Sequence, residues 1–458
     1  MEIYNMIAEL CSGIINSCQE DFFIRFSCVS NAERDRIDRI IKGKVPDLSD
    51  GNHQVHILSE EDLTDEFYER LKNLIKELSD EQDYFATVRL IQILDKAVED
   101  LLHKMVKDFQ VEEYSLVMNS NREQTGVGLL PRCSCWWERK GRLAHHYNRM
   151  DNFLFNLLLM ENSILGELID KHIFLKNHFF ENFDRKKRLR IAATALKNSK
   201  DFSIINKDNK GVNYFGIEYD KGKENADNEL IWKKICDAAD KKVDIIVFPE
   251  MLGNSEMEKY VIERLGEIPE KRRKDIPSLI ILPSYWHKRK NVVSVLDKYG
   301  NVLCRQNKQN PFRLENEGVG CLEGIYTSFT VNIFHYEGIG RFAILICKDF
   351  LTTKYLEQLM RCFKLTLIIV PSFSTGSYDF VQSFDLCAHD DCNVVWINTC
   401  AAMEKDKVSN FEYVGYVRKR ISRFDDESQK LCPMESCKGM KEGKCKRDCL
   451  YIEDINAV

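Results

Sequence analysis

The chain has 458 residues, of which 44% are hydrophobic, so it can bury a large core and, at roughly 100–200 residues per domain, should form two or three domains. Its 66 basic and 72 acidic residues leave a formal net charge of -6, which does not point to nucleic acid or an acidic membrane surface as a general partner. The first residues show no basic segment followed by a long apolar run, and most of the 17 cysteines stand singly in apolar segments. We therefore expect a cytoplasmic protein with reduced thiols and no membrane partner.

Helical spacing of apolar residues dominates up to about residue 186. Ser59 and Asp62 stand at capping positions, and the residues after them place an apolar stripe on one helical face. Residues 84–109 repeat this pattern, and the apolar stretch at 153–165 predicts a core helix. An all-α N-terminal domain is expected at residues 1–186.

Between residues 187 and 424, apolar strands alternate with helical segments. A basic linker leads into a strand at 189–196, and later strands include VDIIVF, RFAILIC and LTLIIVPS. The strands on either side of Tyr299, Gly300 and Asn301 predict a hairpin, which implies mixed pairing. Continuous apolar strands between helices predict an α/β domain here.

Three reactive residues follow strands of this domain: Glu250 after IIVFP, Lys308 after VLCRQN and Cys347 after FAILI. Strand ends are where open α/β folds hold their chemistry, so the three side chains can share one site. A cysteine thiol needs a neighbouring base or cation before it attacks an amide or nitrile carbon. Glu250 could take the thiol proton and the Lys308 ammonium could stabilise the oxyanion. Taken singly, the two charged residues are typical surface ions and the cysteine is a typical buried thiol.

The order of these residues and the short motifs around them resemble those of the nitrilase superfamily of carbon–nitrogen hydrolases over about residues 189–424. The matching motifs are FPE at 248–250, Asn291 with Gly300, Lys308 followed by Pro311, Cys347 with Asp349, IVPS at 369–372 and Asn398 in VVWINTC. The resemblance implies a four-layer α-β-β-α sandwich with a catalytic Glu–Lys–Cys triad and no organic cofactor. It also implies a homo-oligomer in which subunits pair through their helices.

Members of the family often carry a second glutamate between the lysine and the cysteine, seven residues before a glycine. Glu317 stands in that place relative to Gly324, with Glu315 as its rival, and a solvated loop acid is the alternative interpretation. Lys348 stands where most members have an aromatic residue, and it is expected to favour an anionic substrate or to point into solvent. Phe312 and Ser372 are the other expected substrate-binding residues.

The segment at 425–458 is rich in cysteine. Cys432, Cys437, Cys445 and Cys449 have the spacing C-x4-C-x7-C-x3-C, close enough for four thiolates to surround a zinc ion. A structural zinc site is one interpretation, and free thiols or a disulfide pair are the others. The lysines between 438 and 446 form, with Arg447, a basic patch that either contacts nucleic acid or is merely solvated.

These features together predict a hydrolase that cleaves a non-peptide carbon–nitrogen bond of a small-molecule amide through a thioester. One alternative is an acyltransferase that uses the same triad. The other is a catalytically silent interaction protein in a larger, for example antiviral, system, whose N-terminal helical domain binds a protein partner. The substrate itself is not predicted, because specificity depends on the shapes of loops.

Overall fold

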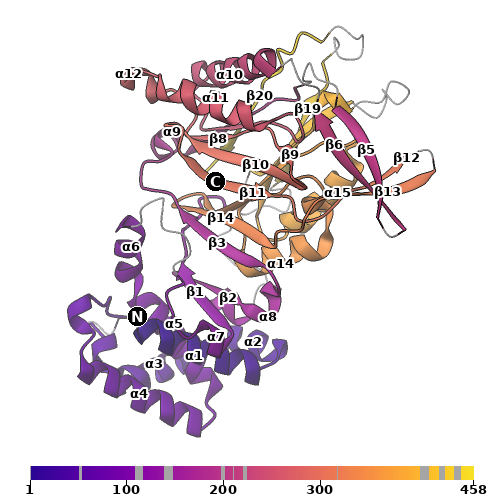
Figure 1. Cartoon of the computed structure of the whole chain (residues 1–458). Coiled ribbons are helices and arrows are strands. Elements are labelled where there is room, and N and C mark those ends of the chain that lie inside the picture. The colour runs from indigo at the N-terminus through magenta and orange to yellow at the C-terminus, as the bar shows by residue number, and fades with distance from the viewer. Residues whose placement is uncertain are drawn as a thin grey trace. The chain divides into compact units, whose positions relative to one another are not determined.

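The computed structural model divides the chain into two compact units, whose elements are labelled in Figure 1. The first consists of Met1–Ser134, Arg139–Gly166 and Arg361–Phe363, and the second of Cys135–Glu138, Glu167–Met360 and Lys364–Val458. The residues that the structure describes are 2–50, 54–108, 117–138, 148–196, 202–209, 211–219, 224–316, 318–402, 412–421, 429–437 and 445–457. Among them, no helix is both long and apolar enough to cross a membrane.

The first unit is built mainly from helices. They are α1 (Glu2–Ser17), α2 (Glu20–Ser27), α3 (Asn31–Lys44), α4 (Asp65–Asp80), α5 (Tyr84–Ala97) and α6 (Glu99–Asp108), with the short α7 (Arg122–Thr125) and α8 (Asn162–Leu165). Their apolar faces bury one core, in which Ile7, Phe67 and Ile91 are fully enclosed. Ser59 and Asp62 form a capping box on a single 3-10 turn, whereas α4 begins after Thr64, whose hydroxyl accepts the Phe67 N–H.

A two-stranded antiparallel sheet also belongs to this unit, which is therefore not purely helical. β1 (Val127–Pro131) pairs with β2 (Leu157–Glu161), with Leu129 opposite Leu159. A core helix was expected at 153–165, and that prediction is wrong for the five residues of β2. A short apolar run fits a buried strand as well as a buried helix, and the pairing with a distant strand decides between them.

In the described part of the second unit, the strands form two seven-stranded sheets and one four-stranded sheet. The first sheet has the order β11-β10-β8-β7-β4-β20, with β9 beside β10, and consists of β4 (Arg188–Ala193), β7 (Ile245–Val247), β8 (Leu279–Ile281), β9 (Tyr285–His287), β10 (Lys290–Asp297), β11 (Val302–Asn307) and β20 (Tyr451–Asn456). The second has the order β19-β18-β17-β16-β15-β14-β3 and consists of β3 (Ile169–Phe174), β14 (Thr330–Tyr336), β15 (Gly340–Ile344), β16 (Leu367–Pro371), β17 (Asn393–Ile397), β18 (Tyr413–Arg420) and β19 (Gln429–Glu435). The third has the order β12-β13-β6-β5 and consists of β5 (Phe202–Asn209), β6 (Val212–Tyr219), β12 (Arg313–Asn316) and β13 (Val319–Glu323).

Helices pack on the two large sheets. The helices after β3 are α9 (Glu181–Lys186), α10 (Glu224–Asp240), α11 (Ser255–Gly266), α12 (Glu270–Arg273), α13 (Lys348–Leu351), α14 (Thr353–Phe363) and α15 (Tyr378–Ala388), and Arg361–Phe363 of α14 belong to the first unit. α10 and α11 pack Ile235 and Val261 into the same apolar cluster as Ile246 of the first sheet. α15 covers the second sheet, where Phe380 stacks on Trp396 with ring centroids 4.7 Å apart.

The order of layers is helix, sheet, sheet, helix (Figure 1). The two large sheets meet where the Gln306 side chain of β11 donates to the Thr330 carbonyl of β14 at 3.1 Å. β4, β7 and β8 are parallel, as are β15, β16 and β17, and β10 and β11 form the expected hairpin. The predicted mixed α/β fold with N-terminal helices is confirmed.

Two segments lie differently from the ranges 1–186, 187–424 and 425–458 expected from the sequence. Residues 167–186 were assigned to the helical domain, but β3 pairs in parallel with β14 and α9 lies in the second unit. The segment after residue 424 was expected to be a separate tail, but β19 pairs with β18 and β20 pairs with β4. Charged residues interrupt β3 and β20, so neither shows the apolar pattern that marks a strand in a sequence.

Candidate active site

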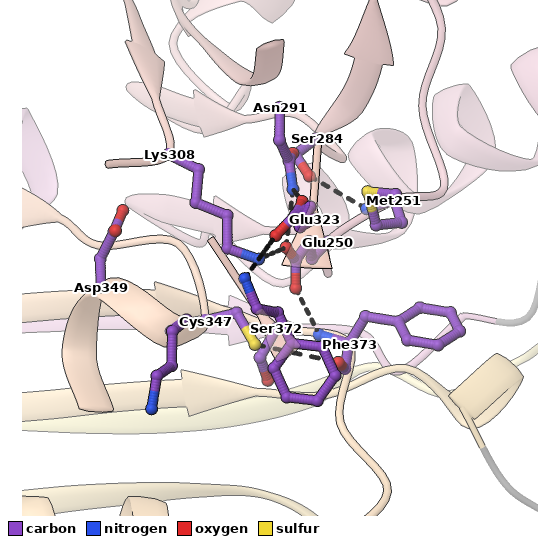
Figure 2. A network of polar contacts seen from close by, with 12 residues as sticks. Glu250, Met251, Ser284, Asn291, Lys308, Glu323, Cys347, Asp349, Ser372 and Phe373 are labelled. Carbon is purple, nitrogen blue, oxygen red and sulfur yellow. Dashed lines mark hydrogen bonds and ion pairs between the residues drawn. The ribbon is translucent and has the colours of Figure 1, made fainter. Parts of the chain in front are cut away.

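Residues from four strands converge near the carboxyl ends of β7 and β15. Glu250 follows β7, Lys308 follows β11, Cys347 lies between β15 and α13, and Glu323 is the last residue of β13. Figure 2 shows the Lys308 side chain reaching the two glutamates, with Cys347 and Phe373 beside Glu250. The rigid sheets thus hold these side chains together although they are far apart in the sequence.

Lys308 is enclosed between two carboxylates. Its Nζ lies 2.9 Å from Glu250 Oε1 and 2.7 Å from Glu323 Oε2, and all three side chains are at most 3% exposed. Burial alone would favour the neutral amine, but the two carboxylates raise the pKa of Lys308 well above its usual value. The lysine therefore remains an ammonium ion in a cluster of two acids and one base.

Glu250 is fixed through both of its oxygens. Asn291 Nδ2 donates to Oε1 at 2.7 Å, and the Phe373 N–H donates to Oε2 at 2.8 Å. Burial raises the pKa of Glu250, the charge of Lys308 opposes this, and the charge of Glu323 adds to the rise. A fixed carboxylate with a raised pKa suits a group that accepts and returns a proton near neutral pH.

Cys347 forms a sharp turn between strand and helix. Its φ of 48° lies in the left-handed region, which is strained for a residue with a side chain, and its N–H donates to the Pro371 carbonyl at 2.9 Å. The sulfur lies 3.8 Å from the Phe373 carbonyl oxygen. Burial and then the charge of Glu250 raise the pKa of Cys347, while Lys308 opposes the rise. The resting group is therefore a protonated thiol.

Asp349 ties the cysteine turn to the loop that carries Lys308. Its Oδ1 accepts the N–H of Gln309 at 2.9 Å and that of Asn310 at 2.7 Å, and the Asn310 side chain also donates to it at 3.0 Å. Burial raises the pKa of Asp349 to about 7, although these hydrogen bonds oppose the rise. The carboxylate thus positions the residues that follow the lysine.

Asn398 holds the segment after β16. This segment includes Phe373, which contacts Glu250 through its N–H and Cys347 through its carbonyl. Its Oδ1 accepts the Ser374 N–H at 2.9 Å, and its Nδ2 donates to the Ser374 carbonyl at 2.8 Å. The side chain is only 1% exposed. Asn398 therefore holds the backbone beside Phe373, which makes these two contacts.

The structure brings together Glu250, Lys308 and Cys347, but the second carboxylate beside the lysine is Glu323. Glu317 lies outside the described residues, and Glu315 is an exposed residue that faces Arg313 at 3.5 Å. Glu323 was not among the residues expected from the sequence. The available signal was its place at the end of a short strand directly before Gly324, between the lysine and the cysteine.

The expected substrate-binding residues differ in their access to solvent. Phe312 is 40% exposed, and its N–H donates to Glu323 Oε2 at 3.0 Å. Lys348 is partly exposed at the first position of α13. Ser372 is fully buried and its hydroxyl donates to the Ile397 carbonyl at 3.1 Å, so its side chain serves the packing of β16 against β17.

The four cysteines of the C-terminal segment do not form a metal site in the part of the chain that is described. Cys432 is buried on β19, Cys437 is exposed, and Cys449 lies 3.4 Å from the Thr194 hydroxyl. No group of three or more His, Cys, Asp or Glu side chains within the described ranges could hold a metal ion, so structural zinc is not supported. Most of the neighbouring basic patch lies outside the described residues.

No protein-family model matches the chain, and no curated protein matches it. Several solved structures resemble it. The amidase of Nesterenkonia sp. AN1, described as a nitrilase-superfamily enzyme, is 13% identical over 56% of this chain and 96% of its own, with a TM-score of 0.35. The Caenorhabditis elegans NitFhit protein is 16% identical over 59% of this chain and 61% of its own, with a TM-score of 0.32. A carbon–nitrogen hydrolase of Helicobacter pylori G27 is 12% identical over 54% of this chain and 89% of its own, with a TM-score of 0.31.

In its mixed α/β body, the chain is similar to solved carbon–nitrogen hydrolases of the nitrilase superfamily, and helices at residues 2–108 come before that body.

Proposed function

We propose that this chain is a nitrilase-superfamily hydrolase that cleaves an amide carbon–nitrogen bond through a thioester on Cys347. The observation that carries the proposal is the buried ammonium of Lys308, held between Glu250 and Glu323. The Cys347 sulfur lies against the carbonyl of Phe373, the residue whose N–H donates to Glu250. Burying three ionisable groups and a strained cysteine costs stability, and such an arrangement is typical of an active site.

In the first half-reaction, Glu250 takes the thiol proton as the sulfur attacks the amide carbon. The oxyanion that forms is stabilised by Lys308 Nζ and by the backbone N–H of Lys348, the first residue of α13. The carbon–nitrogen bond then breaks, Glu250 gives its proton to the leaving amine, and the acyl group remains on the sulfur as a thioester.

In the second half-reaction, Glu250 removes a proton from water, and the resulting hydroxide attacks the thioester. The carbon–sulfur bond breaks, the carboxylic acid leaves, and the thiol regains its proton. The raised pKa of Glu250 suits both directions of proton transfer, and the hydrogen bonds from Asn291 and Phe373 hold its two oxygens in place.

The test is ammonia release from a panel of simple amides, combined with intact-mass analysis of the enzyme. We expect wild type to release ammonia and Cys347→Ala to release none while keeping the same thermal unfolding temperature. An acyl adduct on wild type that is absent from Cys347→Ala would support the thioester. Ammonia release by Cys347→Ala at the wild-type rate would refute the proposal.

The same assay separates the hydrolase from the acyltransferase. With hydroxylamine added, a transferase would form the hydroxamate several times faster than the acid, whereas a hydrolase would give mainly the acid. The homo-oligomer and a protein partner for the helical domain stay predictions, and light scattering of the purified chain measures the first of them.

A further inference from the structure

The turn between β9 and β10 places cations in a strained backbone. His287 pairs with Lys290, so Lys288 and Arg289 are the two turn residues, with φ values of 47° and 62°. Two-residue hairpin turns with positive φ at both positions are usually built from Asn and Gly, because a Cβ atom is unfavourable there. The requirements of the turn therefore do not explain two long basic side chains at these positions.

Arg289 connects this turn to the active site. Its Nε donates to the Gly324 carbonyl at 2.9 Å, and Gly324 directly follows the Glu323 that contacts Lys308. Its Nη1 lies 3.2 Å from the Tyr326 hydroxyl, and its guanidinium carbon lies 4.3 Å from the centre of that ring. On the other side of the turn, Asn291 is the residue that donates to Glu250. The turn is thus joined to both glutamates of the site.

The charges of the turn are not neutralised by neighbouring acids. Within the described ranges, none of the ion pairs includes Lys288, Arg289 or Lys290, and both lysines are exposed. The buried cluster next to them holds two acids and only one base, so by itself it repels an anion. Guanidinium groups bind carboxylates and phosphates well because their donors match the geometry of these anions.

We propose that Arg289, assisted by Lys288 and Lys290, binds an anionic group of the substrate, a carboxylate or a phosphate, close to the scissile amide. This inference rests on the proposed function, because it assumes that substrates approach Cys347. It defines the substrate class as amides with a negatively charged acyl or amine portion, and it makes Arg289 a specificity-determining residue.

The test compares the alkylation of Cys347 by iodoacetate and by iodoacetamide, in which the sulfur displaces iodide and Glu250 accepts the thiol proton. The two reagents differ mainly in charge, and mass spectrometry of the peptide that contains Cys347 separates its rate from those of the other cysteines. In Arg289→Gln we expect the ratio of the iodoacetate rate to the iodoacetamide rate to fall about two- to sixfold, as for one charge roughly 8–10 Å away at an effective dielectric of about 40–80. Arg289→Lys should keep most of the ratio, since it keeps the charge.

Arg272→Gln is the matched control for charge, because Arg272 is exposed on the helix α12. It should leave the ratio of the iodoacetate rate to the iodoacetamide rate unchanged. The double variant Lys288→Gln/Lys290→Gln removes exposed side chains only, so it tests the inference even if Arg289→Gln fails to fold. If succinate but not inorganic phosphate protects Cys347 from alkylation, the anionic group of the substrate is a carboxylate. If phosphate but not succinate protects it, the anionic group is a phosphate.

An unchanged ratio in Arg289→Gln and in the double variant, or an equal fall in Arg272→Gln, would overturn the inference while leaving the proposed function intact. A Cys347 that reacts with neither reagent would instead overturn the proposed function.

Discussion

Replacing Glu323 with glutamine tests whether the second carboxylate takes part in the site. The substitution keeps the shape of the side chain and an oxygen that can accept the Phe312 N–H, but it removes the charge 2.7 Å from Lys308 Nζ. A hydrogen bond between charged groups contributes about 1.5–3 kcal/mol, and loss of that amount from the transition state corresponds to roughly a 10- to 150-fold fall in kcat. KM should change little, because Glu323 contacts the lysine.

The pH dependence of the rate should also change in Glu323→Gln. The charge of Glu323 contributes to the raised pKa of Glu250, so its removal lowers that pKa. The rising limb of the rate against pH, which follows ionisation of the base, should therefore move to lower pH in Glu323→Gln.

Steady-state ammonia release between pH 5 and pH 9 measures both effects, with the exposed Glu315→Gln as control. We expect Glu315→Gln to behave as wild type. Equal rates in the two variants, or a rising limb that stays in place in Glu323→Gln, would refute the reasoning.

The remaining predictions concern two buried residues that hold the loops of the site. Asp349→Asn should lower kcat, since an amide group would face the N–H donors of Gln309 and Asn310. Burial raises the Asp349 pKa from 3.8 to about 7, so the unfolding free energy of wild type should fall as pH rises between these values. Denaturant titrations of the variant should not show this fall. Asn398→Ala removes both hydrogen bonds to Ser374 and should cost about 1–3 kcal/mol of unfolding free energy together with a fall in kcat. An unfolding curve and a rate that match wild type would contradict the positioning role of Asn398.

The three residues that the sequence identified have one property in common. Glu250 and Cys347 each follow a strand whose apolar run is visible in the sequence, and Lys308 follows the second strand of a hairpin whose turn is visible at Gly300, so their place at an edge of a sheet depends on local pattern. Glu323 depends on tertiary pairing: it is positioned because β13 pairs with β12 and, in parallel, with β6, which lies about a hundred residues earlier in the chain. No local pattern encodes that register. The same limit explains β3 and β20, whose partners lie far away in the sequence.

In the proposed mechanism, the reactivity of Cys347 depends on the charges of Glu250 and Lys308 as well as on the sulfur itself. Burial raises the pKa of both Cys347 and Glu250, so neither group is favoured as an anion by its surroundings, and Lys308 is the cation that compensates for a negative charge on either. A proton that moves from sulfur to carboxylate leaves the net charge of the cluster unchanged, so the transfer needs no further burial of charge. In the proposed mechanism, the energy of forming the nucleophile therefore depends on how Asn291, Glu323 and the Phe373 N–H hold Glu250 and Lys308, and these contacts come from different elements of the second unit.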